Sequence, residues 1–173
     1  STSLPISAHC EDEQTIKDNT EYYSNLYGDN IPIEIHPKIR SEIACFKSSD
    51  FAIKLAKKTG ARLNVFHIST AKELNLFDNK IDLKDKNITA EVCAHHLWFT
   101  DSDYKKLGSK IKWNPAIKSK NDRDSLWNAI SDDRVDIIAS DHAPHTEEEK
   151  NNKYLNCPSG GPMVQHTILS LLQ

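Results

Sequence analysis

Residues 135–146 read Val-Asp-Ile-Ile-Ala-Ser-Asp-His-Ala-Pro-His-Thr, and the fold is decided by this stretch. Its apolar, β-branched start predicts a short strand that stops at Asp141, His142 and His145, side chains that bind metals or move protons. α/β barrels deliver catalytic groups from the C-terminal ends of their strands in this way. Pro144 opposes a regular helix directly afterwards. The alternative is a surface turn with one Asp and two His, but the preceding strand favours a functional site.

The composition is that of a soluble globular protein. The chain has 173 residues, 38% of them hydrophobic and 27% charged, with a net charge of −3. It has no basic excess, so we expect no nucleic-acid partner. It has no apolar run near the ~20 residues of a membrane span and no signal-peptide pattern, so we expect a cytoplasmic protein without a membrane partner. The four cysteines are widely spaced, which indicates free thiols, and we expect Cys45 and Cys93 to be buried.

Strand patterns alternate with helix patterns along the chain. The predicted strands are 4–9, 62–67, 88–93, 135–139 and a weaker one at 110–114. The predicted helices are part of 11–30, then 41–58 with Gly60 as its C-cap, a short one beginning after Thr70, 122–130, and one from about Pro162 to the end. Pro32 and Pro37 suggest an extended connection. Strands alternating with helices predict parallel βαβ units and an α/β fold.

Reactive side chains recur where the predicted strands end, at His9, His67, His95 or His96, Asn114 and Asp141. Because the C-terminal ends of parallel strands open on one face, these side chains should converge on one pocket. Histidine with aspartate suits zinc or a similar divalent ion in a hydrolytic site. Asp141 could take a proton from water and pass it to a leaving nitrogen. Cys10 neighbours His9, but adjacent strand residues point to opposite faces, so Cys10 should not reach the same metal.

Five motifs follow one another along the chain: His9-Cys-Glu-Asp, His67-Ile-Ser-Thr, Glu91-Val-Cys-Ala-His-His-Leu, Lys112-Trp-Asn-Pro and Ser140-Asp-His-Ala-Pro-His. These motifs and their order resemble the dihydroorotases of the amidohydrolase superfamily. The resemblance spans nearly the whole chain, and Asp-His-Ala-Pro-His followed by Glu-Lys is its most specific part. Gly160-Gly161-Pro162 stands where that family has a loop that closes over substrate.

The resemblance implies both a fold and an activity. Residues 1–173 would form the later βα units of a (β/α)₈ TIM-type metallo-dependent hydrolase barrel, with the upstream half missing. The activity would be the reversible interconversion of N-carbamoyl-L-aspartate and L-dihydroorotate in pyrimidine synthesis, with these small molecules as partners. His9 and His67 would bind the more buried zinc of a binuclear pair. Asp141 would bind the other zinc and act as general acid/base, while Asn114 and His145 would bind substrate.

Two elements of that family are absent from the 173 residues. They contain neither the His-x-His of the family's first strand nor its bridging carboxylate, a carboxylated Lys or an Asp. We therefore expect a polypeptide of these residues alone to have little activity and weak metal affinity. A partial barrel also has two open sheet edges, which favour association with another chain or a homo-oligomer.

Two alternatives share much of this pattern. A related cyclic amidase of the hydantoinase or allantoinase kind would keep the metal ligands but should lack His145. A non-catalytic scaffold subunit would keep the barrel and typically lose ligands. Among the remaining residues, His142 should support its turn, Arg40 should lie on the surface, and 57–58 and 147–150 should be solvated faces.

Overall fold

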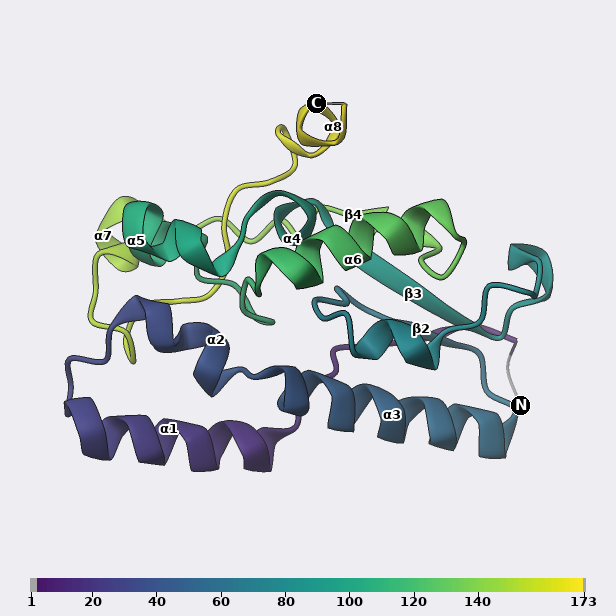
Figure 1. The fold of residues 1–173 in the computed structure, drawn as a ribbon, viewed down its shortest axis with the longest axis horizontal. Coiled ribbons are helices and arrows are strands. Elements are labelled where there is room, and N and C mark those ends of the chain that lie inside the picture. The colour runs from purple at the N-terminus through teal and green to yellow at the C-terminus, as the bar shows by residue number, and fades with distance from the viewer. Residues whose placement is uncertain (1–2, 173) are drawn as a thin grey trace.

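The computed structural model describes residues 3–172, and its centre is one sheet of four parallel strands (Figure 1). The strands are β1 (Ile6–Ala8), β2 (Leu63–Val65), β3 (Ile88–Cys93) and β4 (Ile137–Ala139). They lie in chain order, with Ala8 opposite Val65 and Cys93 opposite Ala139. All four strands therefore end at the same edge of the sheet, as the βα alternation of the sequence predicts.

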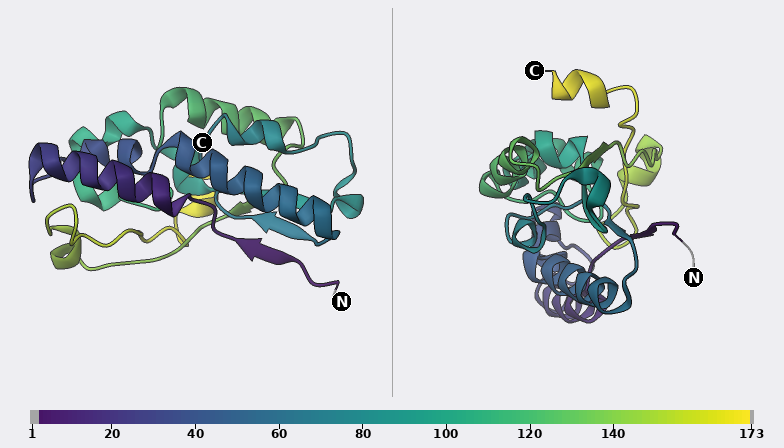
Figure 2. Two further views of the ribbon diagram at one scale, coloured as in Figure 1. Left: turned by 90° about the horizontal axis from the view of Figure 1, so that it is seen from below. Right: turned by 90° about the vertical axis from the view of Figure 1, so that its right-hand side faces the viewer.

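Helices follow the strands and cover the sheet. The α-helices are α1 (Glu13–Tyr27), α2 (His36–Ile39), α3 (Glu42–Thr59), α4 (Ala94–Trp98), α5 (Tyr104–Leu107), α6 (Lys120–Ser131), α7 (Glu147–Lys150) and α8 (Thr167–Leu171). Short 3₁₀ helices are η1 (Ile33–Ile35), η2 (Glu73–Leu76), η3 (Leu83–Asp85), η4 (Asp101–Asp103) and η5 (Gly108–Ile111). Figure 2 shows α3 and α6 on the same side of the sheet.

The sequence predicts α3 closely because its ends are marked locally. Ser41 caps the start, since its hydroxyl accepts a hydrogen bond from the Ala44 amide, and Gly60 ends the helix in the left-handed conformation. The main core lies between this helix, α6 and the two inner strands. It includes Ile53, Ala56, Leu63, Val65, Ala90, Val92, Leu126 and Ala129.

Several expectations from the sequence are wrong. Residues 110–114 form no strand, since 110–111 end η5 and 112–114 have irregular backbone in which the Lys112 ammonium donates to the carbonyls of Tyr154 and Cys157. The segment from Pro32 to Pro37 is helical, as η1 and α2, rather than extended. Lys150 is buried rather than solvated, whereas Glu147 to Glu149 and the Lys57-Lys58 pair are exposed as expected.

Cys45 and Cys93 are buried, as predicted.

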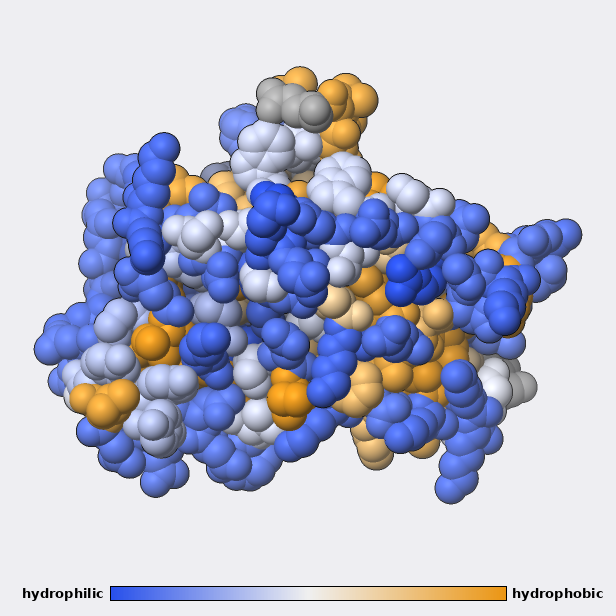
Figure 3. Space-filling model, viewed as in Figure 1, coloured by the Kyte–Doolittle hydropathy of each residue, from blue (hydrophilic) through white to orange (hydrophobic). Residues whose placement is uncertain are grey.

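Several large apolar side chains are exposed on the surface. The edge strands expose Ile6 and Ile138, and α8 exposes Ile168 and Leu169. Helix α8 projects at the top of Figure 3, where part of the surface is apolar. Among residues 3–172, no helix is both long and apolar enough to cross a membrane.

A buried ion pair ties together the starts of β3 and β4. The Lys86 ammonium lies 2.7 Å from the Asp136 carboxylate, and both side chains are only 4% exposed. Lys86 also donates to the Asp133 carbonyl at 2.7 Å, and Asp136 accepts from the Ala90 amide at 2.9 Å. This network lies at the N-terminal ends of the strands, where an α/β sheet keeps groups that serve stability.

We predict that Asp136→Asn lowers the free energy of unfolding by about 3 kcal/mol, because it leaves the buried Lys86 charge without its counter-charge. Urea denaturation followed by circular dichroism measures the change. Asp82→Asn is the matched control, since its pair with Lys84 is exposed on both sides. Equal effects of the two substitutions would contradict the structural role of the buried pair.

Four histidines within residues 3–172 are buried: His36, His67, His95 and His96. Burial is the largest cause in each case and lowers their pKa values, to about 4 for His67 and about 3 for His95, and well below the ordinary value for the other two. The protein therefore holds these rings neutral at neutral pH.

We predict that stability falls as the pH is lowered from about 7 to 5. An unfolded histidine has a pKa of about 6.5 and binds a proton in this range, while the folded rings do not. His67 alone would account for about 2 kcal/mol at pH 5. Urea denaturation in a chelating buffer at both pH values measures the loss, with the exposed His166→Gln variant as control. Equal stability at pH 7 and pH 5 would refute the prediction.

Candidate active site

The ends of β1 and β2 bring together two histidines that are 58 residues apart. His9 follows β1 directly, and His67 follows β2 after one further residue. The Nδ1 atom of His9 lies 2.9 Å from the Nε2 atom of His67, and the rings meet edge to face with centroids 4.7 Å apart. Cys10, in contrast, is buried in the core on the opposite side, as strand alternation predicts. The parallel sheet thus aims one nitrogen of each ring at a common point.

Strained backbone occurs at two of the predicted site residues. His67 has a φ of +39° and Asp141 a φ of +44°, both in the left-handed region that non-glycine residues rarely adopt. Such a conformation costs about 1–3 kcal/mol and persists only where the surrounding structure imposes it. Both residues follow strand ends on the same edge of the sheet. Strain at these positions points to a site rather than to ordinary turns.

A buried carboxylate holds the His9 ring from behind. Glu11 Oε2 accepts from His9 Nε2 at 3.1 Å and also pairs with the Arg40 guanidinium. Burial alone would raise the pKa of Glu11, but the hydrogen bond from His9 and the charge of Arg40 outweigh it and lower this pKa. Glu11 therefore stays ionised and fixes which nitrogen of His9 carries the proton.

The sequence pattern assigned no role to Glu11 and placed Arg40 on the surface. The available signal was the spacing, since residues 9 and 11 lie on one face of an extended chain. The contact with Arg40, however, spans 29 residues and could not be read from the local pattern.

Asp141 lies at the tip of β4, beside the histidine pair. Its pKa is raised by partial burial of its carboxyl, and the charge of His9 opposes this rise. The pKa of Glu91 on β3 is also raised. Burial is the larger cause, and the negative charge of the nearby Asp141 contributes. A carboxyl with a raised pKa next to imidazole groups is suited to exchange protons. His9, His67 and Asp141 thus all follow strand ends at the same edge of the sheet.

His95 and His96, between which the sequence could not choose, have different surroundings. His96 Nε2 donates to the Pro115 carbonyl at 3.0 Å, which packs this ring against the loop after η5. His95 stacks on the Trp113 indole, with centroids 4.4 Å apart and an interplanar angle of 6°. Neither nitrogen of His95 has a hydrogen-bond partner of normal geometry. His67 lies close enough to contribute to the lowered pKa of His95, after burial.

The predicted substrate-binding residues are linked through a single serine. Ser159 donates its hydroxyl to Asn114 Oδ1 at 3.0 Å, and its carbonyl accepts from His145 Nε2 at 3.2 Å. His145 also approaches the Glu149 carboxylate at 3.5 Å. Asn114 does not follow a strand, contrary to the sequence expectation, since 110–114 forms no strand. Asn114 is instead linked to His145 through Ser159, which contacts both side chains.

His142 supports the loop, as predicted. Its Nδ1 atom accepts hydrogen bonds from the backbone amides of Met163 and Val164, both at 3.1 Å. A backbone bridge also joins it to Gly161. The ring is therefore engaged with the segment before α8.

The donor set fits a divalent metal ion in part. Two imidazole nitrogens bound to one tetrahedral zinc lie about 3.3 Å apart, close to the 2.9 Å between the His9 and His67 nitrogens. Within residues 3–172, however, no three His, Cys, Asp or Glu side chains converge closely enough to hold one ion. The described residues thus offer a pair of histidine ligands and a neighbouring carboxylate, and further ligands would have to complete the coordination.

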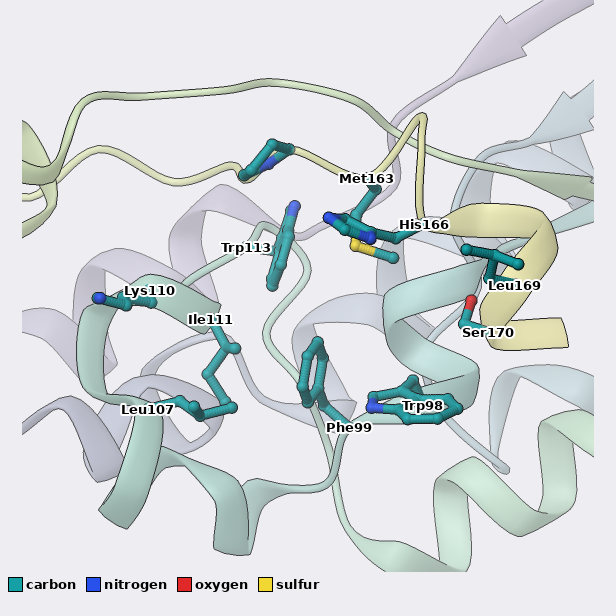
Figure 4. A pocket seen from close by; sticks show the side chains of 11 residues that line it. Trp98, Phe99, Leu107, Lys110, Ile111, Trp113, Met163, His166, Leu169 and Ser170 are labelled. Carbon is teal, nitrogen blue, oxygen red and sulfur yellow. The ribbon is translucent and has the colours of Figure 1, made fainter. Parts of the chain in front are cut away.

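An apolar cavity lies beside Trp113, the indole that stacks on His95. It has a volume of about 430 Å³ and lies among α4, η5 and α8 (Figure 4). Trp98, Phe99, Ile111, Trp113, Met163 and Leu169 contribute to its lining. None of the five predicted site residues lines it, so its size alone does not make it the candidate site.

The chain is similar in sequence to curated dihydroorotases, although no family model matches it. The chain is 32% identical over 157 residues to the dihydroorotase of Anoxybacillus flavithermus, covering 91% of this chain and 35% of that protein. It is 33% identical over 172 residues to the dihydroorotase of Endomicrobium trichonymphae, covering 98% and 38%. The chain thus spans little more than a third of the length of these curated relatives.

Solved structures show the same fold. An L-hydantoinase (dihydropyrimidinase) from Arthrobacter aurescens matches 99% of this chain with a TM-score of 0.89 at 20% identity, over 38% of its own length. A dihydroorotase from Saccharomyces cerevisiae, in complex with 5-fluoroorotic acid, matches 76% of this chain with a TM-score of 0.68 at 21% identity, over 37% of its own length. Sequence and fold agree: the chain is similar to the dihydroorotases over little more than a third of their length, and it has the fold of part of an α/β barrel.

Proposed function

We propose that the chain supplies part of the active site of a zinc-dependent cyclic amidohydrolase. The reaction would be the reversible interconversion of N-carbamoyl-L-aspartate and L-dihydroorotate in de novo pyrimidine biosynthesis. The observation that carries the proposal is the His9–His67 pair, whose facing nitrogens lie 2.9 Å apart beside the strained Asp141. The curated relatives named above support dihydroorotate as the substrate.

His9 and His67 would hold one zinc ion of a binuclear pair, and Asp141 would contribute to the second. Zinc when bound would supply Lewis-acid chemistry, polarising the ring carbonyl and lowering the pKa of water to about 7. Glu11 would keep His9 in the tautomer whose Nδ1 atom faces the metal, because its carboxylate accepts the Nε2 proton. The three missing ligands, the two histidines of the His-x-His and the bridging carboxylate, would come from outside these 173 residues.

Asp141 would move the proton in both directions. In hydrolysis, water adds to a ring carbonyl carbon, the C–N bond breaks, and the leaving nitrogen takes a proton. The raised pKa of Asp141 suits a group that accepts a proton from water and passes it to that nitrogen. Its left-handed backbone at the end of β4 would fix the carboxylate at the edge where the strands end.

Asn114 and His145 would bind the substrate. The amide of Asn114 has donors and an acceptor that match a cyclic imide. The Nε2 proton of His145 goes to the Ser159 carbonyl, so the ring would donate to the substrate carboxylate through a protonated Nδ1 atom. Ser159 already holds both side chains, which reduces the ordering that binding would require.

The surroundings of the activity form part of the same proposal. The protein would act in the cytoplasm on small molecules, without nucleic acid or membrane as partner. The exposed Ile6 and Ile138 on the edge strands support association with further polypeptide, such as the rest of the barrel or a second copy.

The test is a substrate panel of dihydroorotate, hydantoin and allantoin, with the natural protein that contains these residues. We predict preferential hydrolysis of dihydroorotate, and turnover that is slower by about 10²–10⁴-fold in Asp141→Asn, because the proton carrier is removed. Asp124→Asn, on the exposed face of α6, is the control. A polypeptide of residues 1–173 alone should show little or no turnover. Preference for hydantoin or allantoin would replace the proposed substrate, and the absence of any turnover would favour a scaffold subunit.

We also predict that Glu11→Gln weakens zinc affinity by about 10–100-fold, because a neutral amide no longer fixes the His9 ring. Competition with a chromophoric chelator measures the affinity. Glu13→Gln is the matched control, since Glu13 lies exposed in the first turn of α1. An unchanged zinc affinity in Glu11→Gln would separate Glu11 from metal binding.

A further inference from the structure

Lys150 is a buried cation whose ammonium donates to backbone carbonyl groups. It ends α7 and is 5% exposed. The acceptors are the carbonyls of Pro158 at 3.0 Å, Gly160 at 2.9 Å and Lys112 at 3.2 Å. The three N–H groups of one ammonium are thereby matched by three oxygens. The first two of these oxygens flank Ser159.

The residue between those carbonyls is the one that touches both predicted substrate-binding side chains. The Ser159 hydroxyl donates to Asn114, and its carbonyl accepts from His145. A small hollow of about 210 Å³ beside this turn is lined by His145, Lys150 and Gly160, among others. Lys150 thus contacts the two residues on either side of Ser159, and Ser159 contacts the side chains that would meet the substrate.

The turn has little room to adjust. Gly160 has a φ of +130°, and a Cβ there would come within 2.8 Å of the Ala143 side chain. A Cβ on Gly161 would overlap the Trp113 indole, which itself stacks on His95. Gly160 is therefore in close contact with Ala143, in the segment after β4, and Gly161 with Trp113. A displacement of this turn must move Ser159 against its two partners.

We propose that Lys150 is a positioning residue for substrate binding: its ammonium holds the 158–160 turn in place, so that Ser159 keeps Asn114 and His145 oriented toward the substrate. This inference rests on the proposed function for its substrate. It also explains why Lys150 is buried, although the sequence predicts a solvated surface at 147–150. The neighbouring Lys112 assists by donating to the carbonyls of Tyr154 and Cys157, earlier in the same loop.

No other side chain fits this place equally well. Methionine has similar length but no donor, so it would leave the Gly160 carbonyl without a partner and the Pro158 carbonyl with only the weak Cys157 thiol donor. The Lys112 carbonyl would keep the Gly160 amide as its donor at 2.8 Å. Arginine presents its donors in a flat fork rather than in the tetrahedral arrangement of an ammonium. The function of the turn therefore depends on the ammonium group itself.

The experiment compares Lys150→Met with two lysine controls in the natural protein. Lys153→Met removes an exposed charge from the same loop. Lys86→Met removes a buried lysine from the opposite end of the strands, and so reports what a loss of stability alone does. We expect Lys150→Met to raise KM for dihydroorotate by about tenfold or more while kcat changes by less than about threefold, because uniform binding is lost. Both controls should keep the wild-type KM.

Hydrogen exchange of the backbone amides at 157–163 is measured on the same proteins. We expect faster exchange at 157–163 in Lys150→Met and wild-type exchange in Lys86→Met, because Lys150, unlike Lys86, donates to the carbonyls of this turn. Unchanged exchange in Lys150→Met overturns the inference whatever the enzyme does. With faster exchange, an unchanged KM overturns the link to substrate binding. A wild-type protein without turnover refutes the proposed function instead, and faster exchange then still supports the role of Lys150 in holding the turn.

Discussion

The parallel alignment of the four strands is the constraint on which the site depends. Because β1 to β4 pair in chain order and in one direction, His9, His67 and Asp141 emerge at the same edge. An antiparallel neighbour would send its reactive side chain to the opposite edge. The buried pair of Lys86 and Asp136 lies at that other edge. Stability and chemistry are thereby placed at opposite ends of the same strands.

The site is organised before any ligand arrives. Glu11 holds the His9 ring through its second nitrogen, and Arg40 keeps Glu11 charged. The left-handed backbone at His67 and Asp141 has an energetic cost that the rest of the fold must offset. Side chains fixed in this way bind a metal or a substrate with less loss of freedom than mobile ones.

The loop of residues 146–161 forms the other half of the arrangement. It carries the serine that joins Asn114 to His145, and its carbonyl groups are held by two buried lysines. Its close contacts at Gly160 and Gly161 place it against the strand tips and Trp113. A loop that reads as charged and solvated in sequence is thus a packed part of the site, since Lys150 and Cys157 are buried within it.

The sequence by itself determined the βα order, the capped helix α3, and the position of His9, His67 and Asp141 at strand ends. These features follow from local periodicity, from capping residues, and from motifs a few residues long. The same patterns predicted a strand at 110–114 that does not form, and they left His95 and His96 undecided. Only the tertiary structure shows the irregular backbone at 112–114, the different surroundings of His95 and His96, and the partners of Glu11 and Lys150. The physical reason is distance along the chain: Glu11 meets Arg40 across 29 residues, and Lys150 meets the Lys112 carbonyl across 38. Contacts of that range leave no periodic signal in the sequence.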